Sequence, residues 1–221
     1  LEYAFRTIET IRKYEGKLPP KIIPQTRPLW SHSREMIQIN LYQVLRDADP
    51  ANRDKYTQII QNQIDKIFSY FVKPQYKALL EIVGPEGEMT EGPEGRCINP
   101  GHTIETVWFI LKECDPQKDR ELIEKTLQVL DWALEWGWDD EYGGLYSFLD
   151  VEGKQPAQIE WDMKYWWPHC EAIYACLLAF EYTGRLGYWD WFMRLHEYTW
   201  SHYPDIKYGE WFGYLRRDGS V

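Results

Sequence analysis

The chain of 221 residues is long enough for one large domain with a hydrophobic core, and 44% of its residues are apolar. Its formal net charge of −10 would repel nucleic acid and anionic membrane surfaces, so neither is expected as a partner. No apolar run approaches the roughly 20 residues that span a bilayer, and no signal-peptide pattern opens the sequence, so we expect a cytoplasmic protein.

Helices are predicted in pairs, and each pair is followed by an aromatic or β-branched segment that ends in Glu-Gly or Asp-Gly. In chain order the helices span 33–47 and 51–71, then 100–112 and 118–136, then 168–183 and 188–203. The three segments that follow the pairs are 76–87, 142–153 and 208–219, and each predicts a short hairpin. The tyrosines that open these segments recur every 66 residues, as do the glycines that close them.

Each repeat is therefore helix, helix, hairpin. One such unit cannot bury its apolar face alone, so the units must stack, either as an open solenoid or as a closed ring of inner and outer helices. The excursion after every second helix favours the ring, with the loops gathered at one rim. We expect an all-α fold and a single domain over residues 1–221. It holds about three units and ends without a closing helix, so further residues are expected at both ends.

Histidines mark the starts of the first helix in each pair. They are His32, His102 and His169, and in a stacked array they would fall at one end and could face a shared pocket. Asn99 and Pro100 are typical of the N-cap and first turn that precede His102. The positive end of the helix dipole favours neutral imidazole, which is the form that a general base needs. Taken one at a time, such a histidine is more often a structural residue.

Two acidic residues follow these histidines. Glu105 lies three residues after His102, and Glu171 lies one 66-residue period further on. Glu105 could orient His102 or serve only the stability of its helix, and Glu171 alone could be a carboxylate that complements the helix dipole.

The sequence is also rich in tryptophan, with 12 residues of this type. Indole rings suit the C–H faces of sugars, although most of them are expected in the core. The four cysteines, Cys97, Cys114, Cys170 and Cys176, show neither a Cys-x-x-Cys pair nor metal-ligand spacing. They are expected to be reduced and mostly buried thiols rather than ligands of zinc or partners in disulfides.

Two motifs in the second half make the chain resemble the N-acylglucosamine 2-epimerase family. They are Asn-Pro-Gly-His-Thr-Ile-Glu at 99–105 and Trp-Trp-Pro-His-Cys-Glu-Ala at 166–172. The resemblance extends from about Gly95 onward. It implies an (α/α)6 barrel of twelve helices, of which this chain would supply about half.

The resemblance also implies an activity. Family members interconvert N-acetylglucosamine and N-acetylmannosamine by proton exchange at C2, without a metal or redox cofactor, and ATP acts as an effector. It assigns His102 and Glu171 as catalytic residues, and it places a second catalytic histidine and an arginine outside this chain. His169, Glu105, Trp166, Trp167 and His32 are the candidates for substrate binding. A homodimer is expected, and the 221 residues alone are expected to be inactive.

Two alternatives stay open. One is a related enzyme on the same barrel, such as an aldose–ketose isomerase or a cellobiose 2-epimerase, which would share the enediolate chemistry. The other is a non-catalytic fragment or binding module.

Overall fold

The computed structural model describes residues 2–14 and 25–221. Its α-helices are α1 (Glu2–Lys13), α2 (His32–Ala48), α3 (Arg53–Lys66), α4 (Pro100–Leu111), α5 (Arg120–Gly137), α6 (Trp166–Thr183) and α7 (Leu186–His202). Short 3₁₀ segments span Pro50–Asn52 and Pro74–Tyr76, and α3 continues into a π-helical turn at Ile67–Phe71.

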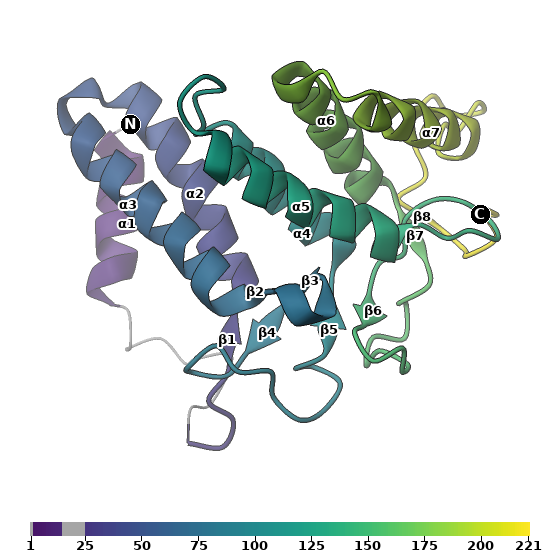
Figure 1. Ribbon diagram of the computed structural model, residues 1–221, viewed down its shortest axis with the longest axis horizontal. Helices are drawn as coiled ribbons and strands as arrows, with labels where there is room; N and C mark the ends of the chain where they lie inside the picture. Colours follow the sequence, from purple (N-terminus) through teal and green to yellow (C-terminus); the bar gives the residue numbers. More distant parts are fainter. Residues whose placement is uncertain (1, 15–24) are drawn as a thin grey trace.

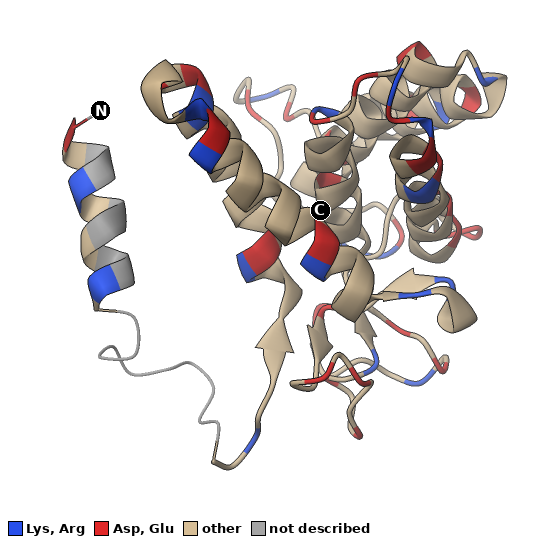
Figure 2. Cartoon of the chain, turned by 60° about the vertical axis from the view of Figure 1, so that its left-hand side comes forward, with Lys and Arg blue, Asp and Glu red and all other residues tan. Residues whose placement is uncertain are grey.

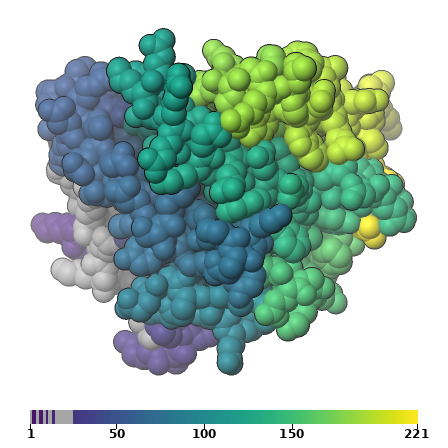
Figure 3. Space-filling view, in the orientation of Figure 1, coloured from purple at the N-terminus to yellow at the C-terminus, as the bar shows by residue number. Residues whose placement is uncertain are grey.

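From α2 onward the helices form three pairs. Each even-numbered helix packs against the odd-numbered helix that follows it in the chain. The even-numbered helices also contact one another in order, so α4 lies between α2 and α6 (Figure 1). The space-filling view shows the consecutive pairs as neighbouring sectors (Figure 3). The predicted stack of helix pairs is therefore confirmed.

One continuous apolar core holds these pairs together. It draws buried residues from every helix from α2 to α7, and the helical stripes expected from the sequence lie in it, among them Ile60, Ile64, Leu127, Leu130 and Leu134. Burial of each such side chain contributes about 1.5–3 kcal/mol. Three of the four cysteines are buried, Cys170 is half-buried, and all four are free, as predicted.

Strands of two residues tie the start of each pair to its end. β1 (Trp30–Ser31) precedes α2 and pairs antiparallel with β4 (Ile82–Val83), which follows α3. In the next units β5 (Cys97–Ile98) pairs with β6 (Leu149–Asp150), and β7 (Lys164–Tyr165) pairs with β8 (Tyr214–Leu215). One further ladder joins β2 (Val72–Lys73) to β3 (Ala78–Leu79). Each repeat is thus closed by a ladder between segments far apart in its sequence.

The predicted hairpins are only partly correct. Each Glu-Gly or Asp-Gly pair does end a tight turn, because Gly87, Gly153 and Gly219 adopt φ of +80°, +71° and +81° and donate to a carbonyl three residues back. However, the strand before each of these turns pairs with the strand that precedes the first helix of the unit, and not with its own neighbour.

The predicted helix starts differ from the observed ones by up to two residues, except at α4. α6 begins at Trp166, so Pro168 stands third in the helix rather than first. This is tolerated because the first four N–H groups of a helix have no partner within it. Helix α1 was not predicted at all. Acidic and basic residues are interspersed along the helices and loops (Figure 2), and no helix within residues 2–14 and 25–221 is long and apolar enough to cross a membrane.

Candidate active site

The start of α4 is built as the sequence predicts. The side chain of Asn99 caps the helix by accepting a 3.0 Å hydrogen bond from the backbone N–H of His102, and Pro100 occupies the first position. Gly101 is required for a different reason. A Cβ atom at this position would lie 2.6 Å from the indole of Trp167, on α6. The glycine therefore lets Trp167 approach, and its ring lies 5.4 Å from that of His102.

The ring of His102 is held by a carboxylate that the sequence analysis did not identify. Nδ1 of His102 lies 3.0 Å from Oε2 of Glu81, in the short link between β3 and β4. The side chains are 28% and 14% exposed, respectively. Within the described ranges nothing bonds the other ring nitrogen, Nε2 of His102. Nδ1 of His102 is thus bonded to Glu81, and Nε2 can bond a ligand.

His32 lies on the far side of the same carboxylate. Its Nδ1 is 4.0 Å from Oε2 of Glu81, which is too long for a hydrogen bond, and its ring is fully buried. Its Nε2 lies 2.9 Å from the hydroxyl of Thr106, and that hydroxyl also donates to the backbone carbonyl of His102 at 2.8 Å. Of the three histidines at helix starts, His32 and His102 are therefore brought together.

The electrostatic surroundings of His102 differ from the expectation. Burial alone would lower its pKa, but the hydrogen bond and charge of Glu81, with the charge of Glu105, raise it above the ordinary value. The prediction from the helix dipole, which favours the neutral ring, is wrong because Glu81 outweighs it. The two imidazoles in turn hold the pKa of Glu81 well below its usual range, although burial opposes this.

Glu105, one turn further along α4, forms an acidic pair with Glu171 of α6. Burial and the charge of Glu171 raise the pKa of Glu105 to about 7, whereas the charge of His102 lowers it. Burial also raises the pKa of Glu171, against a 2.5 Å hydrogen bond that its carboxylate accepts from the indole N–H of Trp108. Glu105 is thus within electrostatic reach of both predicted catalytic residues, His102 and Glu171.

His169 is placed differently from the other two. It is the fourth residue of α6, whereas His32 is the first of α2 and His102 the third of α4, so the three rings leave their helices in different directions. The ring of His169 is fully buried, accepts the N–H of Leu145 at Nε2 and faces the carbonyl of Tyr165 at 2.7 Å through Nδ1. Of the three histidines predicted to face a shared pocket, His32 and His102 thus lie beside one carboxylate, whereas His169 bonds other partners, and substrate contact by His169 finds no support in this geometry.

The two predicted tryptophans lie at the first two positions of α6. Trp166 is 45% exposed, and Trp167 is half-buried against His102. Trp167 therefore lies at the candidate site, and Trp166 presents an exposed ring at the start of the same helix.

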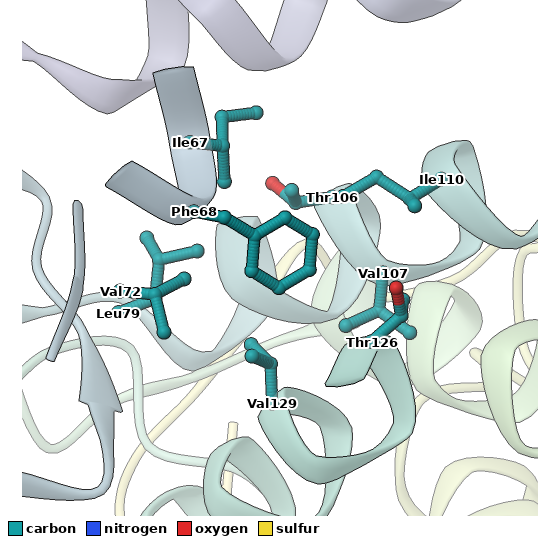
Figure 4. A pocket seen from close by; sticks show the side chains of 9 residues that line it. All are labelled: Ile67, Phe68, Val72, Leu79, Thr106, Val107, Ile110, Thr126 and Val129. Atoms are coloured by element: carbon teal, nitrogen blue, oxygen red, sulfur yellow. The ribbon is translucent and has the colours of Figure 1, made fainter. Parts of the chain in front are cut away.

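The side of α4 that faces the preceding helix pair is anchored in the core. Thr106, Val107 and Ile110 line a closed apolar site with the π-turn residues Ile67 and Phe68 (Figure 4). The space among these side chains does not admit a water molecule. Such dense packing fixes the rotation of α4, and it thereby fixes the direction in which His102 and Glu105 leave the helix.

Sequence reasoning missed Glu81, Thr106 and Trp108. One signal for Glu81 was present, because the positions one and two repeats later hold Ser147 and Gly213, so the carboxylate departs from the repeat. Trp108 follows Glu105 by three residues and therefore shares its helix face.

Comparisons with known proteins agree with this geometry. A model of the N-acylglucosamine 2-epimerase (GlcNAc 2-epimerase) family matches residues 26–221. The N-acylglucosamine 2-epimerase of Rattus norvegicus is 37% identical over 190 residues, which cover 84% of this chain and 44% of the rat protein. That of Bos taurus is 38% identical over 225 residues, which cover 100% of this chain and 52% of the bovine protein.

Solved structures support the fold. A D-mannose isomerase matches with a TM-score of 0.72 at 19% identity, over 90% of this chain and 51% of the isomerase. The cellobiose 2-epimerase of Bacillus thermoamylovorans matches with a TM-score of 0.64 at 23% identity, over 84% of this chain and 44% of that enzyme.

The helix pairs thus place the chain in the class of (α/α)6-barrel proteins, of which they form a part. Within that class the chain belongs to the N-acylglucosamine 2-epimerase family. It spans about half the length of the curated relatives that it matches.

Proposed function

We propose that the full-length protein interconverts N-acetylglucosamine and N-acetylmannosamine by removing and returning a proton at C2 of the open-chain sugar. The observation that carries the proposal is the setting of His102. Its Nδ1 is bonded to Glu81, its Nε2 is free among the described residues, and its side chain is partly exposed next to Glu105. Membership of the family supplies the substrate class.

The chemistry requires one base and one acid on opposite faces of the sugar. The C1 carbonyl makes the hydrogen at C2 acidic, so Nε2 of His102 takes it as a proton and leaves an enolate, which resembles the enediolate of a sugar with a hydroxyl group at C2. A second group then returns a proton to the other face of C2, which inverts the configuration without net oxidation. Histidines suit both steps because imidazole changes charge near neutral pH. The family resemblance places the second histidine, and a substrate-binding arginine, outside residues 1–221.

The remaining site residues are proposed to hold the sugar. Glu171 and Glu105 are close enough to interact electrostatically, and both can accept hydrogen bonds from sugar hydroxyl groups. Burial and the charge of Glu171 raise the pKa of Glu105 to about 7, so Glu105 can also donate one. Trp166 and Trp167 offer ring faces to the C–H surface of the substrate. We assign His32 and His169, whose rings are fully buried, to support of the site.

Deuterium exchange tests this proposal. The full-length protein is incubated with N-acetylmannosamine in D₂O, with and without ATP, and NMR follows the appearance of N-acetylglucosamine and of deuterium at C2. The His102→Asn variant is expected to lose about 10²- to 10⁴-fold of the rate, the usual contribution of a general base, with helicity retained by circular dichroism. His196→Asn, on the exposed face of α7, is the matched control and should keep full rate. Undiminished turnover in His102→Asn would contradict the assignment.

A related reaction is the second candidate, because weaker sequence matches include a D-mannose isomerase at 27% identity and a cellobiose 2-epimerase at 28% identity. Both would use the same enediolate chemistry. A panel that compares N-acetylated sugars with mannose and cellobiose separates the candidates. Turnover of mannose or cellobiose alone would favour this second reading, and no turnover of any sugar would favour a binding module.

Three further properties are proposed on the family resemblance alone. They are regulation by ATP as an effector rather than a reactant, assembly as a homodimer, and a cytoplasmic location. The inactivity of residues 1–221 by themselves also stays a prediction.

A further inference from the structure

We propose that Glu81 is a positioning residue for His102, which it holds by the Nδ1–H group so that Nε2 faces the substrate and exchanges its proton. The inference rests on the proposed function, because it takes His102 to be the base. Glu81 lies outside both motifs that identify the family in this sequence.

The backbone on both sides of Glu81 is fixed. Its N–H donates to the carbonyl of Cys97 at 2.9 Å, and its carbonyl accepts the N–H of His32 at 3.0 Å. Leu80, the preceding residue, donates to Phe71 at 3.0 Å and is fully buried. Glu81 is thus clamped between the strand that precedes α4 and the first residue of α2. This anchored backbone keeps the side chain of Glu81 within reach of His102.

Donor and acceptor roles then follow around the cluster. The hydroxyl of Thr106 has one hydrogen, which goes to the carbonyl of His102, so this oxygen must accept from Nε2–H of His32. The Nδ1 atom of His32 has no hydrogen-bond partner in the described part of the chain and stays 4.0 Å from Glu81. The carboxylate is consequently bonded to one imidazole, that of His102, and is near a second.

This arrangement selects one tautomer of neutral His102. Because Glu81 is an acceptor, the hydrogen lies on Nδ1 and the lone pair lies on Nε2, which is the form that can take a proton from C2. When Nε2 receives that proton, the imidazolium is next to a buried negative charge. The other titratable groups that face the pair are His32 from α2, Glu105 from α4, Glu171 from α6 through Glu105, and the Cys97 thiol from β5.

A Glu81→Gln substitution in the full-length protein removes the charge and keeps the shape. Loss of the carboxylate lowers the pKa of His102, so the acid limb of the kcat/KM profile should move to lower pH. We expect kcat to fall about 10- to 150-fold, the range for a hydrogen bond to a charged group, while KM changes less than about 3-fold. Glu81→Asp, which restores the charge on a shorter side chain, should return the limb toward its original position.

The control separates positioning from simple support of the fold. Asp150 is another buried carboxylate, in β6, and bonds Arg96 rather than a histidine. Asp150→Asn should lower thermal stability and leave the acid limb where it is. NMR of ¹⁵N-labelled histidine follows the ring of His102 directly, with its signals assigned by their loss in His102→Asn. The titration midpoint of that ring should fall in Glu81→Gln.

Three outcomes decide the matter. The positioning role is supported if the acid limb of the kcat/KM profile and the titration midpoint of the His102 ring both move in Glu81→Gln and recover in Glu81→Asp. If the unmodified protein exchanges the sugar proton but neither the acid limb nor the His102 titration midpoint moves in Glu81→Gln, the positioning role is wrong. The proposed function is unaffected by that result. Absence of exchange in the unmodified protein overturns the proposed function instead.

Discussion

The indole N–H of Trp108 donates a 2.5 Å hydrogen bond to the carboxylate of Glu171, and this bond joins α4 to α6 beside the candidate site. It is a direct side-chain hydrogen bond between the helix that carries His102 and the helix that carries the second motif. The bond holds the Glu171 carboxylate near Glu105, and the negative charge of Glu171 raises the pKa of Glu105.

Replacing Trp108 with Phe should weaken catalysis through Glu171. The hydrogen bond lowers the pKa of Glu171 against the effect of burial, so its loss raises that pKa further and reduces the ionised fraction at pH 7. A hydrogen bond to a charged group contributes roughly 1.5–3 kcal/mol, so kcat/KM should fall about 10- to 150-fold. Steady-state kinetics measure the effect. Trp200→Phe, on the exposed surface of α7, is the control; equal losses in both variants would rule out this explanation.

Replacing Glu105 with Gln should stabilise the protein at high pH. The folded state raises the pKa of Glu105 from an ordinary 4.5 to about 7. Above pH 4.5 the unfolded chain therefore loses a proton that the folded chain retains, and stability falls until about pH 7. Glutamine stays neutral and avoids this loss.

Calorimetry at two pH values tests the effect of Glu105→Gln. The melting temperature should rise by about 2–4 °C at pH 8, which corresponds to roughly 1 kcal/mol in a protein of this size, and change little at pH 4.5. Glu181→Gln, at an exposed position of α6, should show no such difference between the two pH values. If the variant is less stable than the unmodified protein at pH 8, the ionised Glu105 carboxylate stabilises the fold, and the prediction is wrong.

His169 should make the protein sensitive to acid. Burial lowers its pKa to about 3, against the opposing effect of the Tyr165 carbonyl, while an unfolded histidine titrates near 6.5. As pH falls below about 6.5, His169 binds a proton in the unfolded chain but stays neutral in the folded chain. The contribution of His169 to stability is thus present above pH 6.5 and lost progressively toward pH 3.

The His169→Gln variant separates the two effects of this residue. Loss of the buried hydrogen bonds should cost about 1–3 kcal/mol at pH 8, and the dependence of stability on pH between 6.5 and 4 should become shallower. Urea unfolding at several pH values measures both quantities. His196→Gln, on the exposed face of α7, should change neither. An unaltered slope in His169→Gln would place the acid sensitivity elsewhere.

The sequence predicted the helices well because their signals are local. Apolar spacing gave the six helices from α2 to α7, and Asn99 with Pro100 gave the start of α4 to the residue. Helix α1 lies before the repeat begins, so the comparison between units could not reveal it. The start of α6 was misplaced by two residues because proline is accepted anywhere in the first turn.

Pairing between distant segments was the harder part. A two-residue strand such as Trp30–Ser31 carries no alternation to identify it, and its partner at Ile82–Val83 is chosen by the packing of the two helices between them. Glu81, the hydrogen-bond partner of His102, was not predicted for the same reason. Glu81 comes within 3.0 Å of His102 in a link whose backbone N–H bonds the carbonyl of Cys97, in the strand just before α4. Motif spacing found His102, Glu105 and Glu171, but it missed Thr106 and Trp108 on α4 as well as Glu81, which a loop contributes.

The ladders that close the three units have a consequence for how the chain folds. Each joins segments about fifty residues apart and encloses one pair of helices, so the two helices of a unit can pair before its neighbours are in place. Nucleation can therefore start in any of the three units and spread to the next by docking of helices. The link that carries Glu81 takes shape with the first unit, and His102 meets it only when the second unit docks.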